Sequence, residues 1–293
     1  MNELNSIKVS IGDASVIVNR SNASFHKKLW DYEVKVFSQW GEDGILSFIC
    51  DTLEISKPKI LEIGAGEFNE CNSKYLVYSR NSSAVLVDSN SNLIRNIKKS
   101  DLEWKTHLKG LNHWVTPKNI NQIRDQAHDY MRGIDILSID LDGNDFWILN
   151  ELNLDTIRVL IVEYNPIFGS RHSVSIPRND EFNRSNFHYS NLFWGASILA
   201  YVNLLSEKGF KLIGTNRVGC NAFFIDSSLS DKFQALNSFK LEDLVDWRIR
   251  ESRDHLGRKT FLDIDKMKKS IENLEVQNTL NGELVPLLSI FED

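Results

Sequence analysis

The hydrophobic pattern in the central part of the chain alternates between short apolar runs and longer amphipathic stretches. Short apolar runs are typical of buried strands, and amphipathic stretches are typical of helices. This alternation predicts βαβ units and a mostly parallel sheet covered by helices. The predicted strands are Ile60–Ile63, Ala84–Val87, Ile134–Ile139, Val159–Val162, Phe210–Ile213 and Ala222–Ile225, and the predicted helices are Ser73–Ser79, Asn92–Ile97, Phe146–Leu152 and Ala196–Leu205.

The spacing departs from this alternation at two places. Phe210–Ile213 and Ala222–Ile225 are too close together for a helical crossover, so we expect an antiparallel pair there. Near the N-terminus, Ile7–Ile11 and Ala14–Val18 alternate around Gly12-Asp13. That pattern predicts a small hairpin, or a strand pair added to a sheet edge.

Residues from about Leu229 onward have a different character, because they are charged and mostly helical in pattern. Asn281-Gly282 lies between Glu275–Asn278 and Glu283–Leu288 and is a good turn signal for another hairpin. The chain is therefore expected to have three parts: an N-terminal hairpin and helix extension (1–36), a central α/β domain (37–228) and a C-terminal helical and hairpin extension (229–293) packed on the same domain.

Composition narrows the class of protein. The 293 residues carry a formal net charge of −6, whereas proteins that bind nucleic-acid backbones are usually basic. No apolar run reaches the roughly 18–20 residues of a membrane span, and the first residues lack the basic start and apolar core of a signal peptide. Cys50, Cys71 and Cys220 are too few and too scattered for a disulfide framework. We expect a cytoplasmic protein without a nucleic-acid partner or a membrane span, whose oligomeric state the sequence leaves open.

A turn that contains two glycines follows the first predicted strand. Gly64 and Gly66 would let the backbone approach a ligand closely. Asp88 ends the second predicted strand, 22 positions after Gly66. A carboxylate at that position can accept hydrogen bonds from both ribose hydroxyls of a nucleoside. The combination predicts a nucleoside site, whereas glycines alone would indicate only a tight turn.

The charges around this turn indicate which nucleoside it suits. A dinucleotide site usually has a third glycine in the motif, but position 69 is Asn. Glu62 and Glu67 would repel a pyrophosphate, whereas S-adenosylmethionine carries an ammonium and a sulfonium cation and no phosphate. Asn72 and Ser73, at the start of the next helix, are candidates to hold its carboxylate. The electrostatics favour the methyl donor.

Carboxylates follow two further predicted strands. Asp140 and Asp142 come directly after one of them, and Glu163 comes directly after the next. Carboxyl ends of parallel strands meet at the edge where open α/β sheets bind ligands, and alternation puts Asp140 and Asp142 on one side if the strand stays extended. We expect a catalytic role for Asp140 or Glu163. All three residues are candidate ligands of Mg²⁺, which would lower the pKa of an acceptor hydroxyl. The alternative is a helix N-cap with acids that favour the helix dipole.

About thirty residues with little periodicity separate Glu163 from the helix near Ala196. Loops of this length in compact domains are usually lids or binding segments. This loop leaves the strand that carries Glu163, so we expect it to overhang the acidic edge. His172 within it is a candidate general base, since histidine has an ordinary pKa near 6.5; the alternative is a surface histidine. The charged run Arg248–Asp254 is interpreted as a solvated helical face.

Four blocks of the sequence resemble the FkbM-like S-adenosylmethionine-dependent methyltransferases. They are Phe37–Gly44, Leu61–Gly66 with Asn72-Ser73, Leu137–Asp145 and Val162–Pro166. The resemblance implies a Rossmann-like class I methyltransferase fold, with a mostly parallel seven-stranded sheet and an antiparallel last strand. It also implies O-methylation, commonly of sugars or secondary metabolites. By the same resemblance, the donor site would be lined by Gln39, Glu62, Gly64, Gly66, Asn72 and Asp88, and Asp140 would lie near the sulfonium with Glu163 across from it.

Together these features predict a methyltransferase that uses S-adenosylmethionine to methylate a hydroxyl of a sugar, glycan precursor or secondary metabolite. Its acceptor would lie between Asp140, Glu163 and the loop around His172. A metal-dependent glycosyltransferase that uses Asp140-Leu141-Asp142 is one alternative, although it does not explain the glycine turn followed by Asp88. A non-catalytic S-adenosylmethionine-binding module is another. A dinucleotide oxidoreductase lacks the third glycine.

Overall fold

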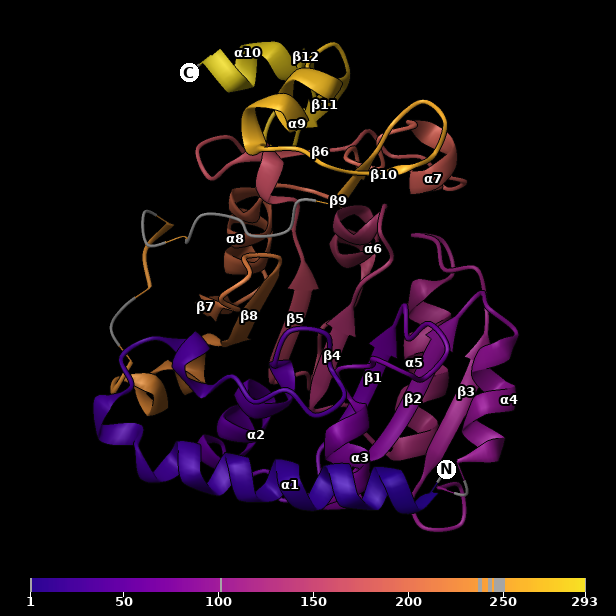
Figure 1. Cartoon of the computed structure of the whole chain (residues 1–293), viewed down its shortest axis with the longest axis vertical. Helices are drawn as coiled ribbons and strands as arrows, with labels where there is room; N and C mark the ends of the chain where they lie inside the picture. The colour runs from indigo at the N-terminus through magenta and orange to yellow at the C-terminus, as the bar shows by residue number, and fades with distance from the viewer. Residues whose placement is uncertain (1, 101, 237–238, 242–243, 245–250, 293) are drawn as a thin grey trace.

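The computed structural model describes residues 2–292 apart from 101, 237–238, 242–243 and 245–250. Its central sheet has seven strands: β1 (Lys59–Ile63), β2 (Ser83–Asp88), β3 (Leu108–Asn112), β4 (Ile136–Ile139), β5 (Val159–Glu163), β7 (Phe210–Thr215) and β8 (Asn221–Asp226). Their order is β3-β2-β1-β4-β5-β8-β7 (Figure 1). β1 to β5 pair in parallel, and β8 is antiparallel to both of its neighbours. The prediction of a Rossmann-like, mostly parallel sheet with an antiparallel last strand is confirmed.

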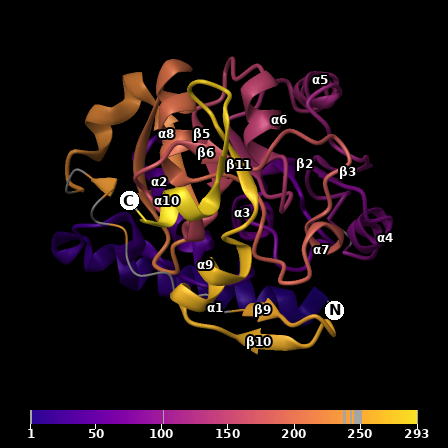
Figure 2. The ribbon, with the colours of Figure 1, turned by 90° about the horizontal axis from the view of Figure 1, so that it is seen from above.

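Helices cover both faces of this sheet, which explains why its strands are nearly continuous apolar runs. On one face lie α2 (Glu42–Thr52), α3 (Lys74–Arg80) and α4 (Asn92–Lys99), and on the other lie α5 (Ile120–Met131), α6 (Asp145–Glu151) and α8 (Ile198–Glu207) (Figure 2). Successive strand side chains enter opposite cores. Ile60 of β1, for example, packs in the core with α2 and α3, whereas Leu61 packs in the core with α5 and α6.

The N-terminal segment corrects one prediction, because Asn2–Ser21 forms a single helix, α1, and the predicted hairpin was wrong. Val9, Gly12 and Val16, three and four positions apart, face the core. This helical period decides the structure, since one stripe of α1 packs against α2 and α3. Gly12, which suggested a turn, instead lets the helix pass close to Val36 and Tyr75.

A small separate layer, which we call the cap, lies above the carboxyl ends of the strands (Figures 1 and 2). It combines the long loop after β5 with the C-terminal segment. Its own apolar core includes Phe168, Phe193, Met267 and Val276. The cap elements are η3 (Pro166–Phe168), β6 (Val174–Ser175), α7 (Arg184–Phe187), β9 (Glu251–Arg253), β10 (Lys259–Phe261), α9 (Ile264–Ile271), β11 (Glu275–Asn278), β12 (Leu284–Pro286) and α10 (Leu287–Glu292).

Two predictions concern the C-terminal part of the cap. The predicted hairpin around Asn281-Gly282 is confirmed, since β11 and β12 pair antiparallel, and β11 also pairs with β6 of the long loop. The helical interpretation of Arg248–Asp254 was wrong for its described part, because Glu251–Arg253 is a strand with Ser252 fully buried. Positions 248–250 of that run lie outside the described residues.

The remaining ordered turns are short 3-10 helices: η1 (Ala23–Phe25), η2 (Leu29–Tyr32) and η4 (Ser227–Phe233). Within the part of the chain that the structure describes, none of the helices has both the length and the apolar character needed to cross a bilayer.

Candidate active site

Three cavities open next to one another at the carboxyl edge of the sheet. The first, of about 420 Å³, lies between the glycine turn after β1, the end of β2 and the long loop. The second, of about 260 Å³, extends from the glycine turn toward the start of α3. The third, of about 360 Å³, lies between the ends of β4 and β5 and strand β9 of the cap. Gln39 and Asp140 line all three, so the cavities meet at these two side chains.

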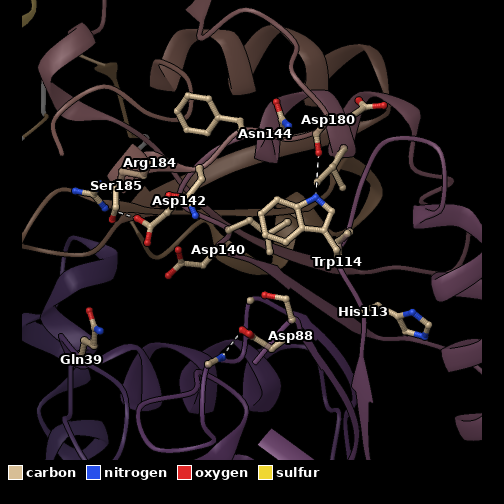
Figure 3. A pocket seen from close by; sticks show the side chains of 18 residues that line it. Gln39, Asp88, His113, Trp114, Asp140, Asp142, Asn144, Asp180, Arg184 and Ser185 are labelled. Carbon is tan, nitrogen blue, oxygen red and sulfur yellow. Dashed lines mark hydrogen bonds and ion pairs between the residues drawn. The ribbon is translucent and has the colours of Figure 1, made fainter. Parts of the chain in front are cut away.

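The glycine turn is shaped by a close approach of two backbones. Gly64 has a φ of 86° and Gly66 a φ of 56°, both in the left-handed region. A Cβ on Gly64 would lie 1.6 Å from the carbonyl oxygen of Asp140, so only glycine lets the turns after β1 and β4 touch. The N–H of Gly66 donates to Asp88 Oδ2 at 2.7 Å (Figure 3). Asp88 therefore fixes the turn and at the same time lines the first cavity.

The second cavity is strongly acidic. Its lining includes five carboxyl side chains and no lysine or arginine: Glu42, Glu62, Glu67, Glu70 and Asp140. Glu62 is buried and accepts hydrogen bonds from the backbone N–H groups of Asn72 (2.8 Å) and Ser73 (2.9 Å) and from the Ser73 hydroxyl. Burial raises the pKa of Glu62, and these hydrogen bonds oppose the rise. Glu62 and Asn72 thus both line the cavity, and the Glu62 carboxylate is already bound by the backbone N–H of Asn72.

Three carboxyl side chains gather at the edge between the first and third cavities. Asp140, Asp142 and Glu163 each place an oxygen within 4.8 Å of the others. The alternation argument assumed that the chain stays extended after β4, but the structure shows a turn there. Asp142 has a left-handed φ of 55°, and the turn is held by Asp145, which accepts the N–H groups of Leu141 (2.7 Å) and Gly143 (2.9 Å). A turn, and not strand alternation, brings Asp142 next to Asp140.

The two innermost carboxyls titrate together. Asp140 is open to the cavities, but protein surrounds its carboxyl on the other sides. This burial, followed by the charges of Asp142 and Asp145, raises the pKa of Asp140 to about 8. Burial and the charge of Asp140 likewise raise the pKa of Glu163 well above its ordinary value. The negative charge of each carboxylate therefore opposes ionisation of the other.

The long loop supplies a cation to this acidic edge. Arg184 forms an ion pair with Asp142 (Figure 3). It also donates from Nε to the carbonyl oxygen of Asn191 at 2.7 Å, and its guanidinium lies 4.7 Å from the centre of the Trp194 ring. It lines both the first and the third cavity. The prediction that the loop overhangs the acidic edge is confirmed, although Arg184 was not among the residues that the sequence singled out.

His172 lies elsewhere in the cap. Its backbone oxygen accepts the hydroxyl of Ser197 at 2.7 Å, next to β6. It is absent from the lining of the three cavities that hold Asp140 and Glu163. Its role as general base stays a prediction, and the two carboxyls are better placed for that role.

Two groups of lining residues were not found from the sequence. His113 and Trp114 follow β3 and line the first cavity, where the indole N–H of Trp114 donates to the carbonyl oxygen of Asp180 at 3.0 Å. Glu251 and Arg253 of β9 line the third cavity. His113 and Trp114 could have been found, because they directly follow β3, whose carboxyl end lies at the same edge of the sheet. The segment of β9 was interpreted as a solvated helical face, because only the folded cap brings it to the site.

The loop that carries Gln39 is held by a buried carboxylate. Asp43 Oδ2 accepts three successive backbone N–H groups, those of Val36 (2.8 Å), Phe37 (2.7 Å) and Ser38 (2.9 Å). Asp43 is fully buried. Burial raises its pKa to about 6, although the three N–H groups act in the opposite direction. The loop that carries Gln39 is thus held by Asp43, whose ionised form is destabilised by burial.

The raised pKa of Asp43 predicts that the stability of the folded protein depends on pH in a specific way. Between its ordinary pKa of 3.8 and its folded pKa of about 6, Asp43 binds more protons in the folded state than in the unfolded state. Its contribution to stability is therefore present below about pH 4 and is lost as the pH rises through about 6, on the order of 3 kcal/mol. Urea unfolding of wild type and Asp43→Asn across this range should show a steeper loss of stability with pH in wild type than in the variant. Parallel curves for the two proteins would contradict the assignment.

Comparisons with known proteins are sparse. No protein-family model and no curated protein matches the chain. Among solved structures, a hemolysin candidate from Lactococcus lactis is 13% identical, with 71% of this chain and 96% of that chain covered and a TM-score of 0.43. The N-terminal domain of EvdMO1 with SAH bound is 10% identical, with 65% and 82% covered and a TM-score of 0.41. An O-methyltransferase family protein from Burkholderia thailandensis is 8% identical, with 63% and 56% covered and a TM-score of 0.37. At this level of similarity the activity of these proteins cannot be assigned to this chain. The function is therefore inferred from the geometry and charges of the site.

Proposed function

We propose that this protein is an S-adenosylmethionine-dependent methyltransferase. The observation that carries the proposal is the meeting of three cavities at Asp140 and Gln39. A sulfonium has three substituents, and in this donor they are the adenosyl group, the amino-acid chain and the methyl group. The first cavity suits the adenosyl group, with the ribose on Asp88. The second suits the amino-acid chain, and the third holds the acceptor toward which the methyl group points.

The charges of the cavities support a cationic donor. The second cavity has five acidic side chains and no basic one in its lining. Such a surface disfavours a pyrophosphate and favours the ammonium and sulfonium of the methyl donor. Asn69, Asn72 and Asn221 offer side-chain amides there for the donor carboxylate. A nucleotide diphosphate, which a glycosyltransferase or an oxidoreductase would bind, would face uncompensated negative charge.

The acceptor is proposed to be a hydroxyl of a sugar, glycan precursor or secondary metabolite. The third cavity combines Trp40 and Trp194 with acidic and basic side chains, a mixture that suits a polar ring with many hydroxyls. In the reaction, the acceptor oxygen attacks the methyl carbon, the carbon–sulfur bond breaks, and S-adenosylhomocysteine leaves. The hydroxyl proton passes to a carboxylate of the Asp140–Glu163 pair, in which both pKa values are raised. Alignment of donor and acceptor supplies much of the rate.

A divalent cation is a further element of the proposal. Asp140, Asp142 and Glu163 offer oxygens within 4.8 Å of one another, which fits Mg²⁺ in donor type. When bound, such an ion would lower the pKa of the acceptor hydroxyl. Arg184 already pairs with Asp142, so the cation and the guanidinium would compete for that carboxylate.

Calorimetry separates the proposal from its rivals. The protein should bind S-adenosylhomocysteine and should not bind NAD⁺ or a uridine diphosphate sugar. Binding of the nucleotide sugar alone, in the presence of Mg²⁺, would favour the glycosyltransferase instead. Binding of S-adenosylhomocysteine without methyl transfer from labelled donor to any component of an extract of the source cells would favour a non-catalytic module.

Asp88→Ala tests the ribose assignment. The variant removes the acceptor of the Gly66 N–H and of the Asn90 N–H, which are both 2.7 Å from the carboxylate, as well as the proposed partner of the ribose hydroxyls. We expect the affinity for S-adenosylhomocysteine to fall at least tenfold, which corresponds to about 1.4 kcal/mol. Titration calorimetry measures it, with Asn90→Ala, which keeps the Asp88 carboxylate and both of its N–H partners, as a neighbouring control. Unchanged affinity in Asp88→Ala would refute the assignment.

A further inference from the structure

The amino-acid chain of the proposed donor carries a carboxylate as well as an ammonium, and the acidic second cavity suits only the ammonium. The described lining of that cavity contains no lysine or arginine, so a carboxylate there would meet negative side chains alone. A cation lies directly behind the lining, however. Lys74 is only 8% exposed, and its Nζ donates to the carbonyl oxygens of Phe68 at 2.8 Å and of Asn69 at 3.4 Å.

The surroundings of Lys74 are unusual for a lysine. Lysine side chains are almost never buried unless they have partners. Besides the two carbonyl oxygens, the partners of Lys74 are the rings of Phe37 and Phe68, whose centres lie 4.7 Å and 5.0 Å from Nζ. Phe68 itself has a left-handed φ of 63°, which is rare for a bulky side chain. Strained backbone of this kind occurs mostly at ligand-binding sites.

The carbonyl groups that Lys74 binds determine where the neighbouring N–H groups point. The peptide units here are trans, so each carbonyl oxygen and the N–H of the next residue point in opposite directions. The N–H groups of Asn69 and Glu70 therefore face away from Lys74. Both residues line the second cavity, and neither N–H donates to a group in the described part of the chain. Successive N–H groups of this kind form a concavity that binds anions.

We propose that Lys74 is a positioning residue that directs the N–H groups of Asn69 and Glu70 toward the carboxylate of the bound donor. The inference rests on the proposed function, which assigns the second cavity to the amino-acid chain. The ammonium polarises the carbonyl ends of the two peptide units, so their N–H ends become stronger donors. Its positive charge also lies only one peptide unit behind the anion. The carboxylates of the lining then remain for the ammonium of the donor.

The test compares two ligands that differ only in the carboxylate. They are S-adenosylhomocysteine and its decarboxylated analogue, which keeps the adenosyl thioether and the amine. Wild type should bind S-adenosylhomocysteine about tenfold more tightly than the analogue in titration calorimetry. Lys74→Met keeps an unbranched apolar side chain but removes the ammonium, and it should make the two affinities nearly equal. A fall in both affinities by the same factor would overturn the proposal, since a merely structural role acts on both ligands.

Lys8 of α1 supplies a matched control. Its Nζ also lies near the Phe37 ring, 5.8 Å from the centre, but the side chain is exposed, and the two carbonyl oxygens are bound by Lys74. Lys8→Met removes one positive charge from the same neighbourhood and should leave the ratio of the two affinities as in wild type. An equal change of this ratio in Lys8→Met and Lys74→Met would overturn the proposal, because only the overall charge would then matter.

A measurement on wild type covers the case in which circular dichroism shows that Lys74→Met does not fold. In NMR spectra of isotopically labelled protein, the backbone amide signals of Asn69 and Glu70 should shift more with S-adenosylhomocysteine than with the decarboxylated analogue. Equal shifts, or equal affinities of wild type for the two ligands, would overturn the role of Lys74 and leave the proposed function in place. A wild type that binds neither ligand would contradict the proposed function itself.

Discussion

Replacing Asp140 by asparagine should lower turnover by about 10²–10⁴-fold and leave the affinity for S-adenosylhomocysteine largely unchanged. Asp140 lines all three cavities, and burial together with the neighbouring carboxylates raises its pKa. An asparagine has nearly the same shape, so the cavities persist, but it cannot accept the hydroxyl proton and carries no charge to face the sulfonium. The measurement is release of S-adenosylhomocysteine from S-adenosylmethionine with an extract of the source cells as acceptor, alongside calorimetry with S-adenosylhomocysteine.

Asp142→Asn is the matched control for this prediction. Asp142 belongs to the same cluster, but its carboxylate is paired with Arg184, and asparagine tolerates its left-handed backbone. We expect a much smaller loss of turnover than in Asp140→Asn. If Asp140→Asn turns over like wild type, Asp140 is not the base. If Asp142→Asn is the more impaired of the two, the ion pair with Arg184 matters more than the Asp140–Glu163 pair.

Gly64→Ala should abolish donor binding and destabilise the protein by roughly 3–5 kcal/mol. The added Cβ would lie 1.6 Å from the carbonyl oxygen of Asp140, so one of the two backbone turns must move. Alanine also disfavours the φ of 86° at this position. Because these turns hold both Asp88 and the carboxyl cluster, their displacement separates the proposed donor and acceptor groups. Urea unfolding measures the stability, and calorimetry with S-adenosylhomocysteine measures the binding.

Gly66→Ala separates backbone strain from steric overlap. Gly66 also has a positive φ, of 56°, but a Cβ there meets no atom within 4 Å. Its substitution should cost only about 1–2 kcal/mol, the usual penalty of the left-handed conformation. Equal destabilisation by the two substitutions would mean that the contact between Gly64 and Asp140 is not tight in solution.

The central sheet was predictable because both of its faces are buried. Strands such as Ile60–Ile63 and Val159–Val162 are then apolar at every position, and the corresponding structural strands differ only by a residue at the ends. β3 and α5 were missed. β3 is an edge strand, and its sequence Leu-Lys-Gly-Leu-Asn has a glycine in the middle and is only partly buried. Such a strand has neither a continuous nor a clearly alternating pattern.

The candidate site was predictable where a strand end alone determines it. Asp88, Asp140 and Glu163 follow parallel strands, so topology alone places them at one edge. The partners contributed by the cap were not predictable, because Arg184 and Arg253 reach the site through packing of segments distant in sequence. In α1, apolar residues lie on the exposed face (Ile7, Ile11) as well as on the face that packs against the core (Val9, Val16). Together they give a short alternating pattern, which led to the wrong prediction of a hairpin.

The composition of the cap has a consequence for synthesis on the ribosome. All strands of the central sheet end by residue 226, whereas β9 to α10 lie after residue 250. Domains assemble from the N-terminal side as the chain emerges. The nascent chain can thus fold the glycine turn and place Asp88 while the C-terminal part of the cap, which lies over Asp140 and Glu163, is still untranslated. A stalled chain would then have the proposed nucleoside site before it has an enclosed cavity for the proposed acceptor.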